Sequence, residues 1–308
     1  MKVLFLGTPE FAVKSLEALL DSEHTVVGVV TQPDRALKHG KTETSAVKKL
    51  AAERGITVFQ PVKIRDCVRE LREFGADIAV TAAYGQILDA AVLESFPRGV
   101  INVHASLLPK YRGASPIQSA IAAGERETGV TIMRTELGLD TGDILATVKT
   151  DIVRGENAGE LSARLSVLGA KLLVDTLDNL DNITPVKQND ALATHCRTIS
   201  KSEQFLDFDN DATAVVDKIL SLSPSPCAKT IINGESYKIY DAKICEEFEG
   251  KRGFAVGEII CTSDKLVIAC ATGCVEVLVI QAPSKRALPV KEFVRGKRFG
   301  AGVICAKP

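Results

Sequence analysis

Short runs of apolar and β-branched residues alternate with helix-like segments through residues 3–180, and this alternation is the strongest constraint on the fold. The strand-like runs are Val3–Leu6, Thr25–Thr31, Asp77–Ala82, Val100–His104 and Val130–Met133. The helix-like segments are Phe11–Leu20, Ser45–Arg54, Pro116–Ala123 and Ala158–Leu180. Strands that alternate with helices form a mostly parallel sheet covered on both faces. We therefore expect a Rossmann-like α/β domain, in which ligands bind at the carboxyl ends of the strands.

A different pattern follows the last of these helices. Residues 185–203 are polar, include Pro185 and show no clear period, which is typical of a linker. Beyond them, the helix-like Ala212–Leu222 precedes short apolar strands interrupted by Gly, Asn and Pro, which favours a small OB-like β-barrel. Because 308 residues is long for one domain, we expect an α/β domain over 1–184, a linker over 185–203 and a β-barrel domain over 204–308.

Charge and composition exclude several broad classes of protein. The formal net charge of −1 excludes binding of nucleic acid by bulk charge, but not by a local basic patch. No apolar run approaches the ~20 residues of a membrane span, so no membrane association is expected. Eight cysteines without a CxxC pair, and an N-terminus without a signal-peptide pattern, predict reduced thiols and a cytoplasmic protein. The histidines are not paired at metal-ligand spacing, so no metal is expected, and Cys270 and Cys274 are expected in a core.

Two polar side chains interrupt the otherwise apolar strand Val100–His104. Asn102 and His104 stand two positions apart, so they project from one face of the strand at the end where the ligand crevice opens. A carboxamide and an imidazole directed at one point stabilise a developing oxyanion or transfer a proton near neutral pH. Taken alone, such a pair is more often a turn-forming asparagine beside a buried histidine whose hydrogen bonds are satisfied.

A carboxylate lies in a tight loop about 30 residues further along the chain. The loop Glu136–Asp143 contains Gly138 and Gly142, with Asp140 in its middle. A carboxylate at this place orients His104 and raises its affinity for a proton. Taken alone, this loop is more often a simple Asx turn.

Together, these stretches resemble a known family. Asn102-x-His104 is followed by Ser-Leu-Leu-Pro and by Tyr-Arg-Gly-x-x-Pro, which ends at Pro116, and Gly-Leu-Asp-Thr-Gly occupies residues 138–142. This combination resembles the 10-formyltetrahydrofolate-dependent formyltransferases. The similar segments elsewhere are Phe5–Phe11, Thr31–Arg35 and Ala83–Leu88.

The resemblance implies a site and an activity. The catalytic residues of the family match Asn102, His104 and Asp140. The segment that lines the folate site matches Ser106, Leu107, Leu108 and Pro109. The implied reaction moves a formyl group from 10-formyltetrahydrofolate to the amino group of methionyl initiator tRNA, with no metal and no covalent nucleophile, and the chain is expected to act as a monomer.

A tRNA acceptor requires local positive charge, because its phosphates must be neutralised. Residues 35–54 and 285–308 are both basic. In the resembling family the loop after the second strand enters the acceptor stem, and the matching cations of this chain are Arg35, Lys38, His39 and Lys41. The loop departs from the family pattern, since His39 stands where an arginine is usual. Ser223–Pro226 departs as well, since most members read Asn-Pro-Trp-Pro there.

Other activities are disfavoured or left as alternatives. The chain lacks GxGxxG after its first strand, GxxxxGK[ST] and GxSxG, which disfavours a dehydrogenase, a P-loop enzyme and an α/β-hydrolase. Three alternatives keep the folate donor and change the acceptor: an amino-sugar nucleotide, a phosphoribosyl glycinamide, or water, the last giving a formyltetrahydrofolate hydrolase. A non-catalytic RNA-binding protein is the alternative of another class, and the intact set Asn102, His104 and Asp140 argues against it.

Overall fold

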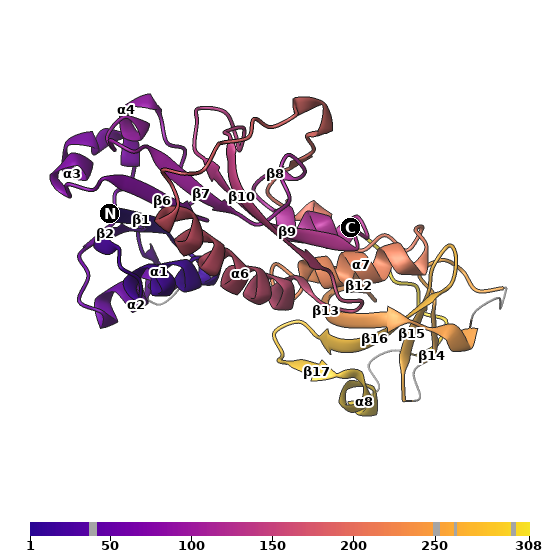
Figure 1. Cartoon of the computed structure of the whole chain (residues 1–308). Helices are drawn as coiled ribbons and strands as arrows, with labels where there is room; N and C mark the ends of the chain where they lie inside the picture. Colours follow the sequence, from indigo (N-terminus) through magenta and orange to yellow (C-terminus); the bar gives the residue numbers. More distant parts are fainter. Residues whose placement is uncertain (37–41, 249–252, 262–263, 297–299) are drawn as a thin grey trace. The chain divides into compact units, whose positions relative to one another are not determined.

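The computed structural model describes residues 1–36, 42–248, 253–261, 264–296 and 300–308 (Figure 1). The chain divides into two compact units. The first consists of Met1–Gly113, Glu127–Asp151 and Ser162–Cys196, and the second of Ala114–Arg126, Ile152–Leu161 and Arg197–Pro308. The boundaries expected at residues 184 and 204 stay a prediction. In the described part of the chain, no helix combines the length and the apolar character needed to cross a membrane.

The first unit is built on a sheet with the strand order β10-β9-β7-β6-β1-β2-β5. Its strands are β1 (Lys2–Gly7), β2 (Thr25–Val30), β5 (Val58–Phe59), β6 (Ile78–Ala82), β7 (Val100–His104), β9 (Glu127–Arg134) and β10 (Ile144–Asp151). Neighbouring strands from β7 to β5 run parallel, whereas β9 and β10 pair antiparallel at the other edge. The expected mostly parallel, Rossmann-like sheet is confirmed, and β5 and β10 at its two edges are additions to the predicted strands.

Helices pack against this sheet because its central strands are apolar on both faces. Residues 3–6 of β1 are fully buried. The helical segments of the unit are η1 (Glu10–Ala12), α1 (Val13–Leu20), α2 (Ala46–Glu53), η3 (Ile64–Asp66), α3 (Val68–Glu73), α4 (Ala90–Leu93), η4 (Asp190–Leu192) and most of α6 (Ala158–Asp178). A Cβ on Gly169 of α6 would lie 3.0 Å from Val103 Cγ1, so this glycine allows the helix to approach β7 closely.

The ends of α2 follow local capping rules. Ser45 Oγ accepts a hydrogen bond from Lys48 N at the start of the helix. Gly55 follows the helix with a φ of +68°, a conformation that glycine adopts without the steric cost of a Cβ. The helix therefore ends within a residue of Arg54, the end of the helix-like segment in the sequence.

The second unit contains an antiparallel sheet with the order β12-β13-β16-β15-β14, and β17 pairs with β16. Its strands are β12 (Ala228–Ile232), β13 (Glu235–Ile244), β14 (Ile259–Cys261), β15 (Leu266–Ala269), β16 (Cys274–Gln281) and β17 (Ala287–Pro289). Its helical segments are α5 (Pro116–Ala122), η5 (Ser202–Gln204), α7 (Ala212–Leu222), η6 (Glu246–Phe248), α8 (Val290–Phe293) and η7 (Val294–Gly296). The expected C-terminal β-domain is confirmed, and Cys270 and Cys274 are buried in its core.

Candidate active site

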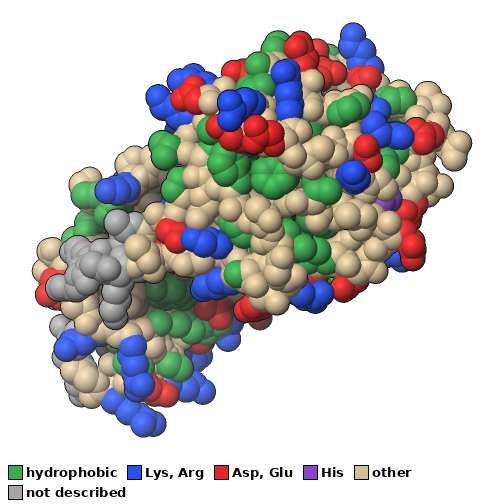
Figure 2. Space-filling model, turned by 90° about the vertical axis from the view of Figure 1, so that its left-hand side faces the viewer, with side chains coloured by type: hydrophobic (Ala, Val, Ile, Leu, Met, Phe, Trp, Pro, Cys, Tyr) green, Lys and Arg blue, Asp and Glu red, His purple; other side chains and the backbone are tan. Residues whose placement is uncertain are grey.

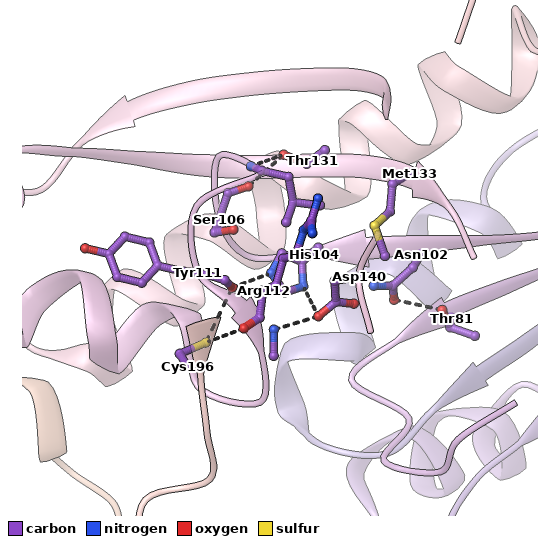
Figure 3. A network of polar contacts seen from close by, with 12 residues as sticks. Thr81, Asn102, His104, Ser106, Tyr111, Arg112, Thr131, Met133, Asp140 and Cys196 are labelled. Atoms are coloured by element: carbon purple, nitrogen blue, oxygen red, sulfur yellow. Dashed lines mark hydrogen bonds and ion pairs between the residues drawn. The ribbon is translucent and has the colours of Figure 1, made fainter. Parts of the chain in front are cut away.

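Strand β7 places the side chains of Asn102 and His104 on the same face of the sheet (Figure 3). Asn102 is in register with Thr81 of the parallel neighbour β6. His104 is in register with Thr131 of the antiparallel neighbour β9. Strand β7 is thus the last parallel strand before the antiparallel edge, and its carboxyl end carries the predicted polar pair.

The carboxamide of Asn102 is oriented by a neighbouring hydroxyl group. Thr81 Oγ1 donates a hydrogen bond of 2.7 Å to Asn102 Oδ1. Because the oxygen end of the amide accepts this bond, the Nδ2 end, which carries the two donor hydrogens, is presented on the other side. Thr81 was not among the residues singled out in the sequence.

His104 is buried, and both of its ring nitrogens face acceptors. Nε2 donates to the carbonyl oxygen of Tyr111 at 2.9 Å, and Nδ1 lies 3.7 Å from Asp140 Oδ2. A carbonyl oxygen can only accept a hydrogen bond, so Nε2 carries a proton in this arrangement, and Nδ1 faces the carboxylate of Asp140. Asp140 therefore lies where the sequence predicted a carboxylate partner for this histidine.

The loop that carries Asp140 connects β9 to β10 and is held in an unusual backbone conformation. Asp140 has a φ of +53°, and its Oδ2 accepts a hydrogen bond of 2.7 Å from Gly113 N. A Cβ on Gly142 would lie 1.9 Å from the carbonyl oxygen of Arg134, so only glycine fits at this point of the loop. The loop is therefore both a strained turn and the element that directs the Asp140 carboxylate toward His104.

Backbone groups of the segment Tyr111–Gly113 complete the surroundings of His104 and Asp140. The segment includes the short strand β8 (Arg112–Gly113), which pairs with β11 (His195–Cys196). Cys196 Sγ lies 3.4 Å from the Tyr111 carbonyl oxygen, the same atom that accepts the bond from His104. The Tyr-Arg-Gly motif was visible in the sequence, but nothing in it showed that its main-chain groups contact His104 and Asp140.

The expected folate segment follows β7 directly and is only partly accessible. Ser106 is fully buried, and its Oγ donates to the Lys110 carbonyl at 2.6 Å. Leu108 is also buried, and its N–H donates to Thr131 Oγ1. Leu107 and Pro109 are half-buried. The Ser106 hydroxyl and the Leu108 N–H thus hold the segment in place, and Leu107 and Pro109 supply its accessible apolar surface.

Of the residues expected to contact tRNA, the structure describes one. Arg35 is exposed on β3 (Arg35–Ala36), which pairs with β4 (Thr42–Glu43). The base of this hairpin is fixed by Lys48 Nζ, which contacts Asp34 Oδ2 and Gln60 Oε1, each at 2.7 Å. Lys38, His39 and Lys41 lie outside the described residues. Both acidic and basic side chains lie on the face shown in Figure 2.

A polar cavity of about 410 Å³ adjoins the Asp140 loop. Its lining residues are Glu136, Thr141, Asp143, Lys187, Gln188 and Asp190. Among the described residues, no group of three or more His, Cys, Asp or Glu side chains is arranged to hold a metal ion. The side chains of Asn102 and His104 at the end of β7 offer hydrogen-bond donors and an imidazole that can carry a proton.

Comparison with known proteins places the chain in a family. The profile described as formyl transferase matches residues 1–177, and the profile of the formyl transferase C-terminal domain matches residues 198–298. The chain belongs to the formyl transferase family. This formyl transferase is 42% identical over 312 residues to the methionyl-tRNA formyltransferase of Lachnospira eligens, with 99% of each chain covered. It is also 42% identical over 304 residues to that of Solibacter usitatus, covering 97% of this chain and 96% of the relative.

Solved structures, one of them of an N-formyltransferase, share the fold. The N-formyltransferase of Helicobacter canadensis, solved with folinic acid and dTDP-3-aminofucose, has a TM-score of 0.70 and 21% identity, over 90% of this chain and 98% of that one. HypX of Aquifex aeolicus, solved with tetrahydrofolic acid, has a TM-score of 0.67 and 16% identity, over 96% of this chain and 47% of that one. The family that the sequence motifs resemble and the fold that they imply are both confirmed.

Proposed function

We propose that this formyl transferase moves a formyl group from 10-formyltetrahydrofolate to the amino group of methionyl initiator tRNA. The observation that carries the proposal is the meeting of Asn102, His104 and Asp140 at the end of β7. Similarity over nearly the whole chain to methionyl-tRNA formyltransferases supports the choice of acceptor. The sugar-nucleotide enzyme of H. canadensis, at 21% identity, supports the fold alone.

The geometry accounts for stabilisation of the charge that develops during transfer. The amine nitrogen attacks the formyl carbon, and the bond from this carbon to the folate nitrogen breaks, so the formyl oxygen carries negative charge on the way. Asn102 Nδ2 is one donor for this oxygen, because Thr81 already occupies the Oδ1 end of the amide. His104 supplies a second donor when the formyl oxygen replaces the Tyr111 carbonyl at Nε2. Donors oriented before the reaction stabilise an oxyanion without reorganisation.

His104 and Asp140 account for the proton that must change place. The attacking amine loses one proton, and the leaving folate nitrogen gains one, so the reaction needs a carrier but releases no net proton. The imidazole of His104 is the carrier with the suitable chemistry near neutral pH. The Asp140 carboxylate, 3.7 Å from Nδ1, stabilises its charged form.

The donor is a co-substrate with a flat aromatic ring, and it requires an apolar surface next to the reacting groups. Leu107 and Pro109 offer such a surface, since they are the accessible members of the segment that follows His104. On the acceptor side, we assign the phosphates of the tRNA to the cations of the loop that begins at Arg35. We place the reaction in the cytoplasm, where initiator tRNA is used in translation. The cysteines that the structure describes in full are free thiols, as is usual in a reducing compartment. We propose that the chain acts as a monomer.

An acceptor-specificity assay tests the proposed function. The purified full-length chain receives 10-formyltetrahydrofolate with methionyl initiator tRNA, methionyl elongator tRNA, a dTDP-linked amino sugar, or no acceptor. Release of tetrahydrofolate and formation of formylmethionine are both measured, with His104→Ala as the control for contaminating activity. We expect rapid transfer with initiator tRNA alone. Release without an acceptor would instead identify a hydrolase, and transfer to the amino sugar would identify a small-molecule formyltransferase.

A further inference from the structure

Gln188 lies in the polar segment between α6 and β11, yet its side chain is 6% exposed. A buried carboxamide costs free energy unless its donors and acceptors are paired. The partners of Gln188 come from two loops of the first unit that are distant from it in the sequence. Both loops contact His104 or hold its carboxylate partner.

The nitrogen end of the Gln188 amide binds the loop that carries Asp140. Nε2 donates to the carbonyl oxygen of Asp140 at 2.9 Å and to that of Gly142 at 2.7 Å. These carbonyls lie on either side of Thr141, so the amide fixes the loop at two points around its tightest turn. Asp140 has a positive φ of +53°, which for a residue with a side chain persists only when the surrounding structure supports it.

The oxygen end of the same amide binds the loop that follows the folate segment. Gln188 Oε1 accepts from Arg112 Nε at 3.0 Å and from Arg112 Nη2 at 2.8 Å. Arg112 is 3% exposed, and its Nη2 also donates to Asp190 Oδ1 at 2.8 Å. Both amide hydrogens and both oxygen lone pairs of Gln188 are therefore used. The amide has one orientation that satisfies these partners, because its reversal would place an NH₂ group against the guanidinium.

We infer that Gln188 is a positioning residue for Asp140, an inference that rests on the formyl transfer proposed above. Its amide joins Arg112, whose neighbours Tyr111 and Gly113 contact His104 and Asp140, to the backbone of Asp140 itself. Gln188 does not touch the reacting atoms in this arrangement. It sets the distance between the carboxylate and the imidazole by holding the two loops together.

Two substitutions at position 188 test the role of the amide. Gln188→Met has a similar length and lacks every hydrogen bond. Gln188→Glu keeps an acceptor for Arg112 but places a carboxylate against two carbonyl oxygens. We expect each to lower kcat for formyl transfer by about 10- to 100-fold, the cost of a small misplacement of a catalytic group, with the KM values for folate and tRNA changed by less than about threefold. Gln204→Met removes another buried glutamine amide, outside this site, and is the matched control.

A double substitution distinguishes positioning from a general loss of stability. If Gln188 acts through Asp140, Gln188→Met lowers kcat by less than about twofold in the Asp140→Ala background, because the group to be positioned is gone. Thermal melting of each variant shows whether it is folded at the assay temperature. If Gln188→Met is unfolded there, Gln188→Glu replaces it in the double variant. Retention of more than half of kcat by the folded variant, or losses that multiply in the double variant, would overturn the inference. An inactive wild-type chain would instead contradict the proposed function.

Discussion

His104 Nδ1 lies 3.7 Å from Asp140 Oδ2, although the histidine ends a sheet strand and the aspartate stands in a loop between two others. The same carboxylate oxygen accepts a hydrogen bond from Gly113 N, and the same imidazole donates to the Tyr111 carbonyl. Side chains and backbone thus form a closed set of contacts, in which the loss of one member misaligns the others. This coupling leads to the first prediction.

Asn102→Ala, His104→Ala and Asp140→Ala should each lower kcat by roughly 10²- to 10⁴-fold, the usual cost of a lost oxyanion donor or acid–base group. The double variant of His104 and Asp140 should lose much less than the product of the two single losses, since the two groups act as a unit. Steady-state kinetics of formylmethionine release measure these values. Retention of more than about a tenth of wild-type kcat by His104→Ala would contradict the assignment.

Gly142→Ala should disturb catalysis without removing any catalytic group. Its Cβ would lie 1.9 Å from the Arg134 carbonyl oxygen, so the backbone of the loop must move and carry Asp140 with it. We expect a loss of about 10²-fold in kcat together with a lower melting temperature. Gly296→Ala is the matched control, because a Cβ there meets no atom within 4 Å. Equal activity of the two glycine variants would show that the loop tolerates the shift.

Joint substitution of Arg35, Lys38 and Lys41 by alanine should weaken tRNA binding and leave the KM for folate unchanged. Each cation that neutralises a phosphate releases counterions, so the slope of log K against log salt should become shallower by up to about 2–3. Binding measured over a series of salt concentrations gives this slope directly. An unchanged slope would show that this loop does not contact tRNA, and would favour a small-molecule acceptor over tRNA.

Asp217 of α7 should make stability depend on pH in a defined direction. Burial raises the pKa of this carboxyl, and the nearby Asp211 raises it further. The positive charges of Arg126 and Arg154 act in the opposite direction. A raised pKa in the folded state means that ionisation costs stability, and this cost appears as the pH rises from below the unfolded value of about 3.9 to above the folded value. Asp217→Asn should therefore raise the melting temperature at pH 7 and leave it nearly unchanged at pH 3. A lower melting temperature of Asp217→Asn at pH 7 would show that the attraction of Arg126 and Arg154 outweighs the effect of burial.

The buried thiols of the second unit should be inert in the folded protein. Burial raises the pKa of Cys270 and of Cys305 to about 12, and the thiolate is the reactive form. Iodoacetamide at pH 8, followed by peptide mass mapping, should label the half-buried Cys67 before either of them, and should label all three after denaturation. Rapid labelling of Cys305 in the native protein would show that its end of the chain opens readily.

Strands β1, β2, β6, β7 and β9 lie where the sequence predicts them, because each is an apolar run that the folded unit buries. Strand β10 was not predicted, since three of its eight residues are exposed and its sequence includes Thr, Lys and Asp. A half-buried edge strand gives a weak signal in a single sequence, whereas a strand covered on both faces gives a strong one.

The candidate site divides in the same way. Asn102 and His104 were recognisable because two polar residues with strand periodicity interrupt an apolar run, which is a local signal. The contacts of the Tyr111 carbonyl and the Gly113 N–H could not be recognised in the sequence, because almost any residue supplies such main-chain groups. Gln188 was hidden for another reason. Its segment has the composition of a linker, and the hydrogen bonds that bury it go to residues far away in the sequence.

Strand β10 also bears on strand pairing between copies of the chain. It is the terminal strand of the sheet, and an open strand edge is a template for pairing with another copy of the chain. At its first residue, Ile144 is bridged to Val186, so part of the edge is already capped by the chain itself. Further along, Lys149 and Asp151 place charges on the edge, and charges there oppose strand addition. The loop of Asp140 is thus anchored to an edge protected against fibril-like growth.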